Sequence, residues 1–385
     1  MKYRVISTDD HLQEGPTTWT DRMDQKKWGS KIPHVKRMDD GNDKWFMWDE
    51  MIGAGGGMTG GIGSVHGAMP DRTVVPMRYE DMPKIAYVPS ERIKAMDQDG
   101  VDVHTFFPNV AGLAGHRLNS SKMDEAFRIE AIRAANDFQL EEYAAAFPGR
   151  FITLALLPMW DVNLAVEELA RTAKLGTNGV TFAFPEGWGF NNISDPYWDP
   201  LWELAQETGL SINFHFGASG NNGIGELPAW EGHSDLRRLA QNSARSMASN
   251  ITIMCTILFS GILERFPRLN IVSSESGLGW IPYLLELADH QWDRQKIYRE
   301  GMDLKPSDYF RRQCYANFWF EMFGPAVRQY IGIDNIMWES DFPHPTCTWP
   351  ESQSYIERSM SDWSEEERHQ VLVGNAARVF HLDAS

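Results

Sequence analysis

Eight short apolar runs recur along the 385-residue chain, and most of them are followed by a longer segment in which apolar residues repeat with helical spacing. Several runs are apolar almost throughout, as expected for strands that are buried on both faces of a parallel sheet. The runs occupy residues 4–8, 101–107, 151–157, 179–184, 211–216, 270–274, 315–320 and 335–339. Eight predicted strands that alternate with helices indicate an α/β fold, a (β/α)₈ TIM-like barrel.

The segments between these runs carry the start and stop signals of helices. Pro89 and Ser90 open one helix, and Asp161 caps another that ends near Gly176. The expected helices beyond the one at Ser90 cover residues 123–147, 162–174, 196–207, 243–266, 279–293 and 361–380. Each of them would pack on the outside of the barrel.

A long insertion separates the first strand from the helix at Ser90. It runs approximately from residue 12 to residue 89, which is far longer than an ordinary connection between a strand and a helix. Its residues 53–63 are rich in glycine and free to adopt positive φ angles, so we expect a mobile lid over the barrel mouth, with a disordered surface loop as the alternative. We find no domain linker and expect residues 1–385 to form a single domain.

The balance of charge limits the possible partners. Acidic side chains number 53 against 36 basic ones, which gives a net charge of −17. Such a field repels phosphate backbones and anionic membrane surfaces. We therefore expect a small-molecule substrate and neither nucleic acid nor a membrane, together with a homo-oligomeric state for which a hetero-oligomer is the alternative.

The three cysteines indicate the compartment. Cys255, Cys314 and Cys347 are far apart and odd in number, so they match neither a disulfide framework nor a CxxC metal knuckle. The N-terminus lacks a basic segment followed by an apolar run, and no apolar stretch approaches the roughly 18 residues of a membrane span. We expect reduced thiols in a cytoplasmic protein.

Polar side chains stand at the ends of three predicted strands, where a barrel carries its active site. Asp9 and His11 follow the first strand and are two residues apart, so in an extended segment both point to the same side. His215 ends the fifth strand, and Asp341 and His344 follow the eighth. Imidazoles and carboxylates together form a mixed nitrogen and oxygen set that suits zinc, iron or manganese.

Several short motifs resemble one known family. The chain is similar to the amidohydrolase-related branch of the amidohydrolase superfamily, which includes the aminocarboxymuconate semialdehyde decarboxylases and the γ-resorcylate decarboxylases. The motifs that carry this resemblance span nearly the whole length and lie at residues 10–16, 91–97, 147–151, 264–269, 340–344 and 374–378.

The resemblance implies a distorted (β/α)₈ barrel whose metal is held at four positions. These positions match Asp9, His11, His215 and Asp341 of this chain. Zinc is the expected ion, with iron or manganese as alternatives and a second ion left open. The chain departs from the family on the sixth strand, because Glu275 is the nearest ionisable group where many relatives carry a histidine.

The roles of Glu275 and His344 stay open at this point. Glu275 is a candidate general acid or base, or a ligand of a second ion, and its structural alternative is a salt bridge across the barrel mouth. His344 is a candidate ligand, acid or partner that orients Asp341, and its structural alternative is a histidine that shapes the proline-rich turn around it.

The leading hypothesis is a metal-dependent hydrolase of a small organic substrate, aromatic or carboxylated. A bound ion would lower the pKa of a water whose proton Asp341 accepts, while Glu275 or His344 protonates the leaving group. The main alternative is a metal-dependent non-oxidative decarboxylase, which the fold and the ligands cannot separate from a hydrolase. Two further alternatives are a two-metal or oxygen-activating enzyme and a supporting subunit of an oligomeric enzyme.

Overall fold

The computed structural model describes residues 3–53, 62–218, 232, 234–246 and 248–384. Within them, eight parallel strands form one sheet in the order β1-β5-β6-β7-β8-β9-β10-β11, so the predicted fold class is confirmed. The strands are β1 (Asp10–Leu12), β5 (His104–Pro108), β6 (Phe151–Ala155), β7 (Gly179–Thr181), β8 (Ser211–His215), β9 (Ile271–Ser274), β10 (Cys314–Phe318) and β11 (Ile336–Trp338).

Backbone hydrogen bonds join the two ends of this strand order. The Thr8 amide donates to the carbonyl of Trp338 at 2.9 Å, and the Asp341 amide donates to the carbonyl of Asp9 at 3.0 Å. The segment that contains β1 therefore lies beside both β5 and β11. The sheet curls into a barrel, and the residues that follow its first and last strands become neighbours.

The first strand lies further along the chain than predicted. Residues 4–8 form only a single bridge, between Ile6 and Val103, and the regular ladder begins at Asp10. The backbone amides of Arg4 and Val5 are bound by the carboxylate of Asp102, which replaces strand pairing at the start of the chain. The regular pairing thus begins just after Asp9 and includes His11.

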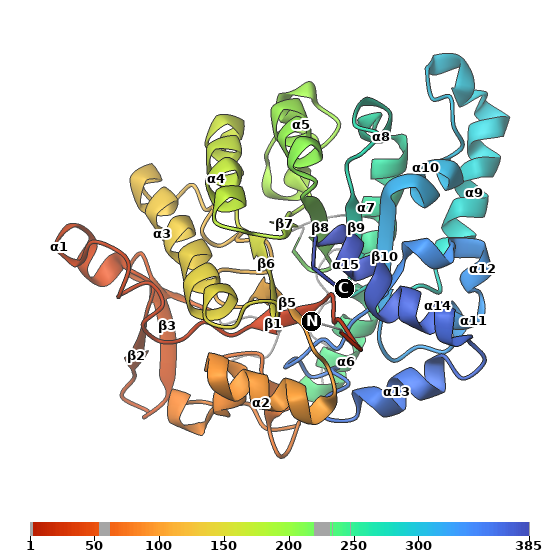
Figure 1. The fold of residues 1–385 in the computed structure, drawn as a ribbon. Coiled ribbons are helices and arrows are strands. Elements are labelled where there is room, and N and C mark those ends of the chain that lie inside the picture. The colour runs from red at the N-terminus through yellow and green to blue at the C-terminus, as the bar shows by residue number, and fades with distance from the viewer. Residues whose placement is uncertain (1–2, 54–61, 219–231, 233, 247, 385) are drawn as a thin grey trace.

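Helices surround the sheet (Figure 1). The α-helices are α1 (Gln25–Trp28), α2 (Pro89–Asp99), α3 (Glu125–Phe138), α4 (Val162–Lys174), α5 (Asp199–Thr208), α6 (Asp235–Ser246), α7 (Ser249–Phe259), α8 (Ile262–Arg265), α9 (Ile281–Gln295), α10 (Pro306–Gln313), α11 (Phe323–Ala326), α12 (Arg328–Ile331), α13 (Ser352–Ser359), α14 (Glu365–His369) and α15 (Asn375–Val379). Shorter 3-10 turns are η1 (Gly29–Lys31), η2 (His66–Ala68), η3 (Tyr79–Asp81), η4 (Lys84–Ala86), η6 (Pro185–Trp188), η7 (Pro196–Trp198), η8 (Ile297–Glu300) and η9 (Ile333–Asn335), and π-helical turns are η5 (Gln139–Ala145) and η10 (Gln370–Gly374).

Several of the predicted helices are divided into shorter elements, two of them into three parts. The helix expected over residues 243–266 divides among α6, α7 and α8, and Gly261 adopts a left-handed φ of 77° between the last two. The terminal helix expected over residues 361–380 divides into α14, the π-turn η10 and α15. Apolar spacing marked both regions as helical, but it does not locate internal breaks.

The insertion is an ordered part of the fold in its described residues. It forms a three-stranded antiparallel sheet of β2 (His34–Arg37), β3 (Asp43–Met47) and β4 (Glu50–Ile52), which lies beside α3 in Figure 1. Trp19 and Trp45 pack edge to face in its core, and the Trp19 indole donates to the carbonyl of Ala131 on α3 at 3.0 Å. The glycine-rich stretch of residues 54–61, on which the expected lid depends, lies outside the described residues.

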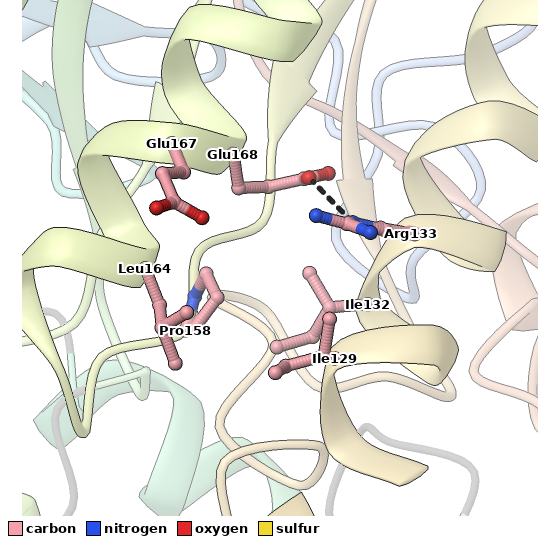
Figure 2. A pocket seen from close by; sticks show the side chains of 7 residues that line it. All are labelled: Ile129, Ile132, Arg133, Pro158, Leu164, Glu167 and Glu168. Carbon is pink, nitrogen blue, oxygen red and sulfur yellow. Dashed lines mark hydrogen bonds and ion pairs between the residues drawn. The ribbon is translucent and has the colours of Figure 1, made fainter. Parts of the chain in front are cut away.

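A small hollow lies between α3 and α4 (Figure 2). Arg133 contacts the Glu168 carboxylate at 3.4 Å, and Arg171 on α4 contacts the same residue at 2.7 Å. The lining residues are Ile129, Ile132, Arg133, Pro158, Leu164, Glu167 and Glu168. The hollow is a packing seam between two helices.

The cysteines and the helices bear on two expectations from the sequence. Cys255, Cys314 and Cys347 are free thiols, as their spacing predicted. Among the described residues, no helix has the length and apolar character that crossing a membrane requires.

Truncation of Trp45 tests the packing of the insertion on the barrel. Trp45 is 1% exposed, so Trp45→Ala should lower the free energy of unfolding by about 3–5 kcal/mol because it leaves a cavity in the core of the insertion. Phe323 is 66% exposed, and Phe323→Ala should cost less than about 1 kcal/mol. Urea denaturation measures both values, and equal losses would contradict this description of the insertion.

Candidate metal centre

The alternation of side chains along β1 divides its polar residues between two sides. The Asp10 carboxylate accepts hydrogen bonds from the amides of Thr105 at 3.1 Å and Phe342 at 3.3 Å, and burial raises its pKa to about 8. The buried guanidinium of Arg92 donates to the carbonyls of His11 and Phe342, each at 3.1 Å. These contacts fix the β1 backbone against the loop after β11, while Asp9 and His11 point to the opposite side.

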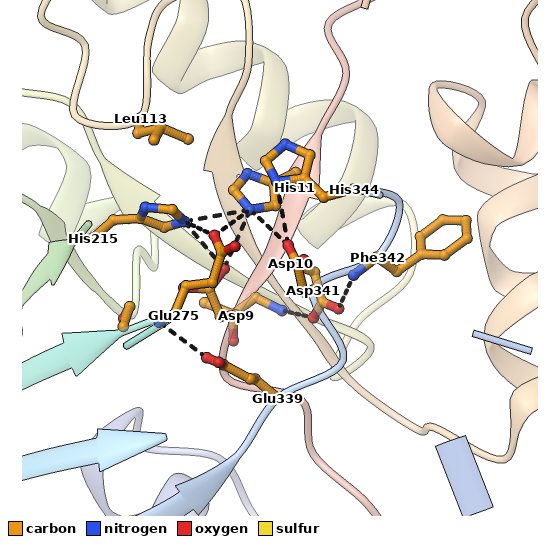
Figure 3. Close-up of polar contacts among 12 residues, drawn as sticks. Asp9, Asp10, His11, Leu113, His215, Glu275, Glu339, Asp341, Phe342 and His344 are labelled. Atoms are coloured by element: carbon orange, nitrogen blue, oxygen red, sulfur yellow. Dashed lines mark hydrogen bonds and ion pairs between the residues drawn. The ribbon is translucent and has the colours of Figure 1, made fainter. Parts of the chain in front are cut away.

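The four side chains predicted as metal ligands lie together (Figure 3). His11 Nε2 is 3.2 Å from Asp341 Oδ1, 3.3 Å from His215 Nε2 and 3.5 Å from Asp9 Oδ1. All four residues are at most 1% exposed. Three strand ends that are hundreds of residues apart in sequence thus converge on one small volume.

Glu275 and His344 extend this cluster. Glu275 follows β9, and its Oε2 lies 2.8 Å from His215 Nε2 and 3.5 Å from His11 Nε2. The His344 ring stacks on that of His11 with centroids 3.3 Å apart, and its Nδ1 is 3.2 Å from Asp341 Oδ1. Two overlapping groups of potential donors result, Asp9, His11, His215 and Glu275 in one and His11, Glu275, Asp341 and His344 in the other.

Hydrogen bonds orient two of the imidazoles. His215 Nδ1 lies 2.6 Å from the carbonyl of Phe216, which requires a proton on Nδ1 and leaves the Nε2 lone pair facing the cluster. His344 Nε2 lies 3.0 Å from Asn109 Oδ1, which leaves Nδ1 facing Asp341. In both residues the nitrogen that faces the carboxylates is the one available to a cation.

Several buried oxygens of the cluster have no hydrogen-bond partner. They are both carboxylate oxygens of Asp9, Oε2 of Glu275 and Oδ1 of Asp341. Burying a charged group without a partner costs roughly several kcal/mol of free energy. These oxygens therefore require a ligand that the chain itself does not provide. A divalent cation fits this donor set, because imidazole nitrogens and carboxylate oxygens are its usual protein ligands.

The electrostatics of the side chains lead to the same conclusion. Burial, followed by the charges of Glu339 and Glu275, raises the pKa of Asp9, and burial with the charges of Asp341 and Glu339 raises that of Glu275. Burial also opposes ionisation of Asp341, but His344 and His11 hold its pKa below the ordinary value. Burial lowers the pKa of His215 to about 4, so this imidazole is neutral and ready to bind a cation.

Two residues of the cluster have strained backbones. Glu275 has a φ of 47° and Asp341 a φ of 60°, in the left-handed region that residues other than glycine rarely adopt. Such conformations persist where the surrounding structure imposes them, and they concentrate at functional sites. Glu275 directly follows β9, and Asp341 lies in the turn after β11. At both positions the carboxylate faces the imidazoles.

Sequence reasoning missed two polar residues beside the cluster. Glu339 is fully buried, and one of its oxygens accepts a hydrogen bond from the Glu275 amide at 3.2 Å. Its position two residues before Asp341 was the signal that could have revealed it. Asn109, which orients His344, follows β5 and has no comparable signal, because its role depends on a partner 235 residues away.

Comparison with known proteins assigns the family. The family model described as amidohydrolase matches residues 34–382. The chain belongs to the amidohydrolase family. Asp9 and His11 precede the matched range, so their place in the cluster comes from the structure and not from this match.

Relatives of this amidohydrolase include decarboxylases. It is 27% identical over 335 residues to a γ-resorcylate decarboxylase of Polaromonas sp.. The aligned region covers 82% of this chain and 93% of that protein. An amidohydrolase structure from Mycobacterium avium subsp. paratuberculosis superposes with a TM-score of 0.74 at 22% identity and covers 99% of this chain and all of that one. A dihydroxybenzoic acid decarboxylase structure from Polaromonas sp. contains bound manganese and the inhibitor 2-nitroresorcinol. It superposes with a TM-score of 0.62 at 21% identity, and the match covers 99% of this chain and 98% of that one.

Thermal unfolding with and without a divalent cation tests the cluster. Addition of Mn²⁺ to chelator-treated protein should raise the melting temperature, since about 100 Kd of a ligand specific for the folded state adds about 2.7 kcal/mol. Asp9→Asn should abolish most of this increase, yet stabilise the metal-free protein at mildly alkaline pH because it removes one of the mutually repelling carboxylates.

Asp303→Asn is the matched control, because Asp303 is exposed and far from β1 in sequence. This variant should respond to Mn²⁺ like the unmodified protein. A metal-induced shift of the same size in Asp9→Asn would contradict the placement of the cation.

Proposed function

We propose that this amidohydrolase is a metal-dependent non-oxidative decarboxylase of a small, hydroxylated aromatic carboxylate. The observation that carries the proposal is the similarity to γ-resorcylate decarboxylases over most of the length of both chains. It favours the decarboxylase alternative over the hydrolase that we ranked first from the sequence. The buried donor cluster is compatible with either reaction, so it supports metal dependence and does not select the reaction.

The proposed ligands are Asp9, His11, His215 and Asp341, and the proposed ion is manganese in place of the zinc expected from the sequence. Manganese is supported by its presence in decarboxylase structures with this fold. When bound, the ion would supply positive charge that holds and polarises an anionic substrate.

Asp341 is the residue to which we assign the proton transfer. Because His344 and His11 lower its pKa, it is a carboxylate in the resting enzyme and can act as a base. The Thr346 hydroxyl donates to Oδ2, whereas Oδ1 faces the imidazoles, so Oδ2 is the oxygen proposed to carry the proton. It would accept the proton of a substrate hydroxyl and return it to the ring carbon that bears the carboxylate.

The last steps of the proposed reaction break the bond between the ring and the carboxylate. Once the ring carbon is protonated, its bond to the carboxylate breaks, the electron pair of that bond returns to the ring, and CO₂ leaves. Burial of the cluster strengthens the charge interactions that guide these steps. Phe107 provides an apolar wall that suits an aromatic ring, with its centroid 4.8 Å from that of His215.

The cellular setting is also a proposal. Three free thiols are compatible with a cytoplasmic protein, and the negative charge supports a small-molecule substrate without nucleic acid or membrane as a partner. A homo-oligomer is proposed because large apolar side chains are exposed on α9 and α12, which contact each other. Tyr283 is 72% exposed and Tyr330 is 60% exposed. A hetero-oligomer would use the same surface.

Release of CO₂ tests the proposed reaction. Protein loaded with Mn²⁺ should release CO₂ from hydroxybenzoates that carry a hydroxyl next to the carboxylate, and chelation should abolish the release until Mn²⁺ is restored. Hydrolysis of ester or amide analogues without release of CO₂ would contradict the decarboxylase and return the hydrolase to first place.

Substitution of Asp341 tests the proton transfer. Asp341→Asn should reduce turnover by about 10²–10⁴, the usual contribution of general acid and base catalysis. Asp303→Asn again serves as the control and should leave turnover unchanged. Full turnover in Asp341→Asn would exclude Asp341 as the proton carrier.

A further inference from the structure

We propose that Ser64 and His66 of the insertion form a subsite for a further hydroxyl group of the substrate, one that is not bound at the metal centre. The inference deepens the proposed function and rests on it, because it specifies which aromatic carboxylates the same site prefers. Neither residue belongs to the two groups of potential metal donors. The subsite therefore concerns the choice of substrate and not the way in which the metal is held.

Two glycines bring the segment of residues 62–68 against the barrel mouth. A side chain in place of Gly67 would collide with the carbonyl of His344, and one in place of Gly63 would collide with the carboxamide of Gln13. Gln13 directly follows β1, and His344 lies in the loop after β11. The segment therefore lies across the ends of these two strands, where the proposed metal centre is located.

Ser64 and His66 lie between these two close approaches, and each is 1% exposed. Val65, which separates them, packs in the apolar core of the insertion. Burial, followed by the charge of His344, lowers the pKa of His66. The imidazoles of His66 and His344 are thus close enough for their charges to interact, so the His66 ring is neutral at neutral pH and lies on the side of the barrel mouth.

The polar atoms of both side chains have no hydrogen-bond partner. They are Ser64 Oγ and both ring nitrogens of His66. Because both residues are buried, bulk water does not replace the missing partner, and leaving such atoms unpaired is unfavourable for folding. Unpaired buried polar groups are few in native proteins. A ligand that binds to these atoms would remove the unfavourable contribution.

The unpaired atoms are complementary to a hydroxyl group. A serine hydroxyl both donates and accepts, and a neutral imidazole donates from one nitrogen and accepts at the other. A ligand hydroxyl can therefore accept a hydrogen bond from one of the two residues and donate one to the other. A carboxylate only accepts, and neither residue carries a positive charge that would offset its burial. A buried site that hydrogen-bonds a substrate hydroxyl discriminates against the analogue that lacks it.

Binding of compounds that cannot lose CO₂ tests the subsite separately from the reaction. The probes are ortho-nitrophenol, whose nitro group has the planar shape of a carboxylate, and its derivatives with one further ring hydroxyl. We expect at least one derivative to bind the Mn²⁺-loaded protein about tenfold more tightly than ortho-nitrophenol, because it pairs buried groups that are otherwise unpaired. Equal affinities throughout, as expected if only an ordered water occupies the subsite, or binding of no probe would overturn the proposal.

The binding test and the CO₂ assay can fail independently. A preference for a hydroxylated probe without release of CO₂ from hydroxybenzoates would contradict the proposed reaction and support the subsite. Release of CO₂ by a protein that shows no such preference would reject the subsite alone.

Variants locate the binding of the further hydroxyl. Ser64→Ala and His66→Phe each remove polar atoms with little change in shape, so each should bind ortho-nitrophenol as the unmodified protein does and lose most of the preference. His290→Gln, at an exposed histidine of α9, is the matched control and should keep the preference. Circular dichroism confirms that each variant is folded. Full preference in folded Ser64→Ala and His66→Phe would overturn the assignment.

Thermal unfolding of the ligand-free protein provides a second readout. Ser64→Ala removes a buried hydroxyl that has no partner, so the melting temperature should stay the same or rise. A hydroxyl with a structural role would give the opposite result. A decrease of several degrees in Ser64→Ala would overturn the claim that this hydroxyl is kept for a ligand.

Discussion

The concentration of negative charge at one end of the barrel is the constraint on which the rest of the structure depends. Asp9, Glu275, Glu339 and Asp341 are nearly inaccessible to solvent, and burial together with mutual repulsion raises the pKa of the first three. Burying uncompensated charges of one sign is strongly unfavourable. A cation offsets this cost, and the neutral imidazoles among the carboxylates supply its remaining ligands.

The surrounding structure holds these side chains in a conformation that they would otherwise leave. Arg92 and Asp10 bind the backbone of β1 to the loop after β11, which fixes Asp9 and His11 beside Asp341. The insertion contributes from the other side, because the Gly67 amide donates to the carbonyl of Pro343 at 2.9 Å. A side chain at residue 67 would collide with the His344 carbonyl at 2.3 Å, so glycine permits this close approach.

Much of this arrangement could be predicted from the sequence, because it follows from local regularities. Buried parallel strands are continuous apolar runs, and the alternation of side chains places Asp9 and His11 on one side and Asp10 on the other. His215 and Asp341 could be identified because they stand at or just after the ends of β8 and β11, where a barrel carries its active site. The family resemblance then extended to nearly the whole chain, and the family match confirms it.

The remaining features depend on contacts between distant residues. Asp102 binds the backbone amides at the start of the predicted first strand, and the sheet of the insertion packs on α3, neither of which a local pattern records. The orientation of His344 depends on Asn109, and the backbone amide of Glu275 is bound by the side chain of Glu339. From the sequence we placed hydrolysis before decarboxylation, because metal ligands alone do not determine which bond breaks. The similarity to decarboxylases favours the opposite order.

The most direct test of the central claim is a crystal structure of the Mn²⁺-loaded protein with anomalous diffraction data collected at the manganese edge. The account predicts a strong anomalous peak enclosed by Asp9, His11, His215 and Asp341, with ligand distances of about 2.0–2.3 Å. Peaks confined to acidic side chains on the surface, with none inside this cluster, would contradict it.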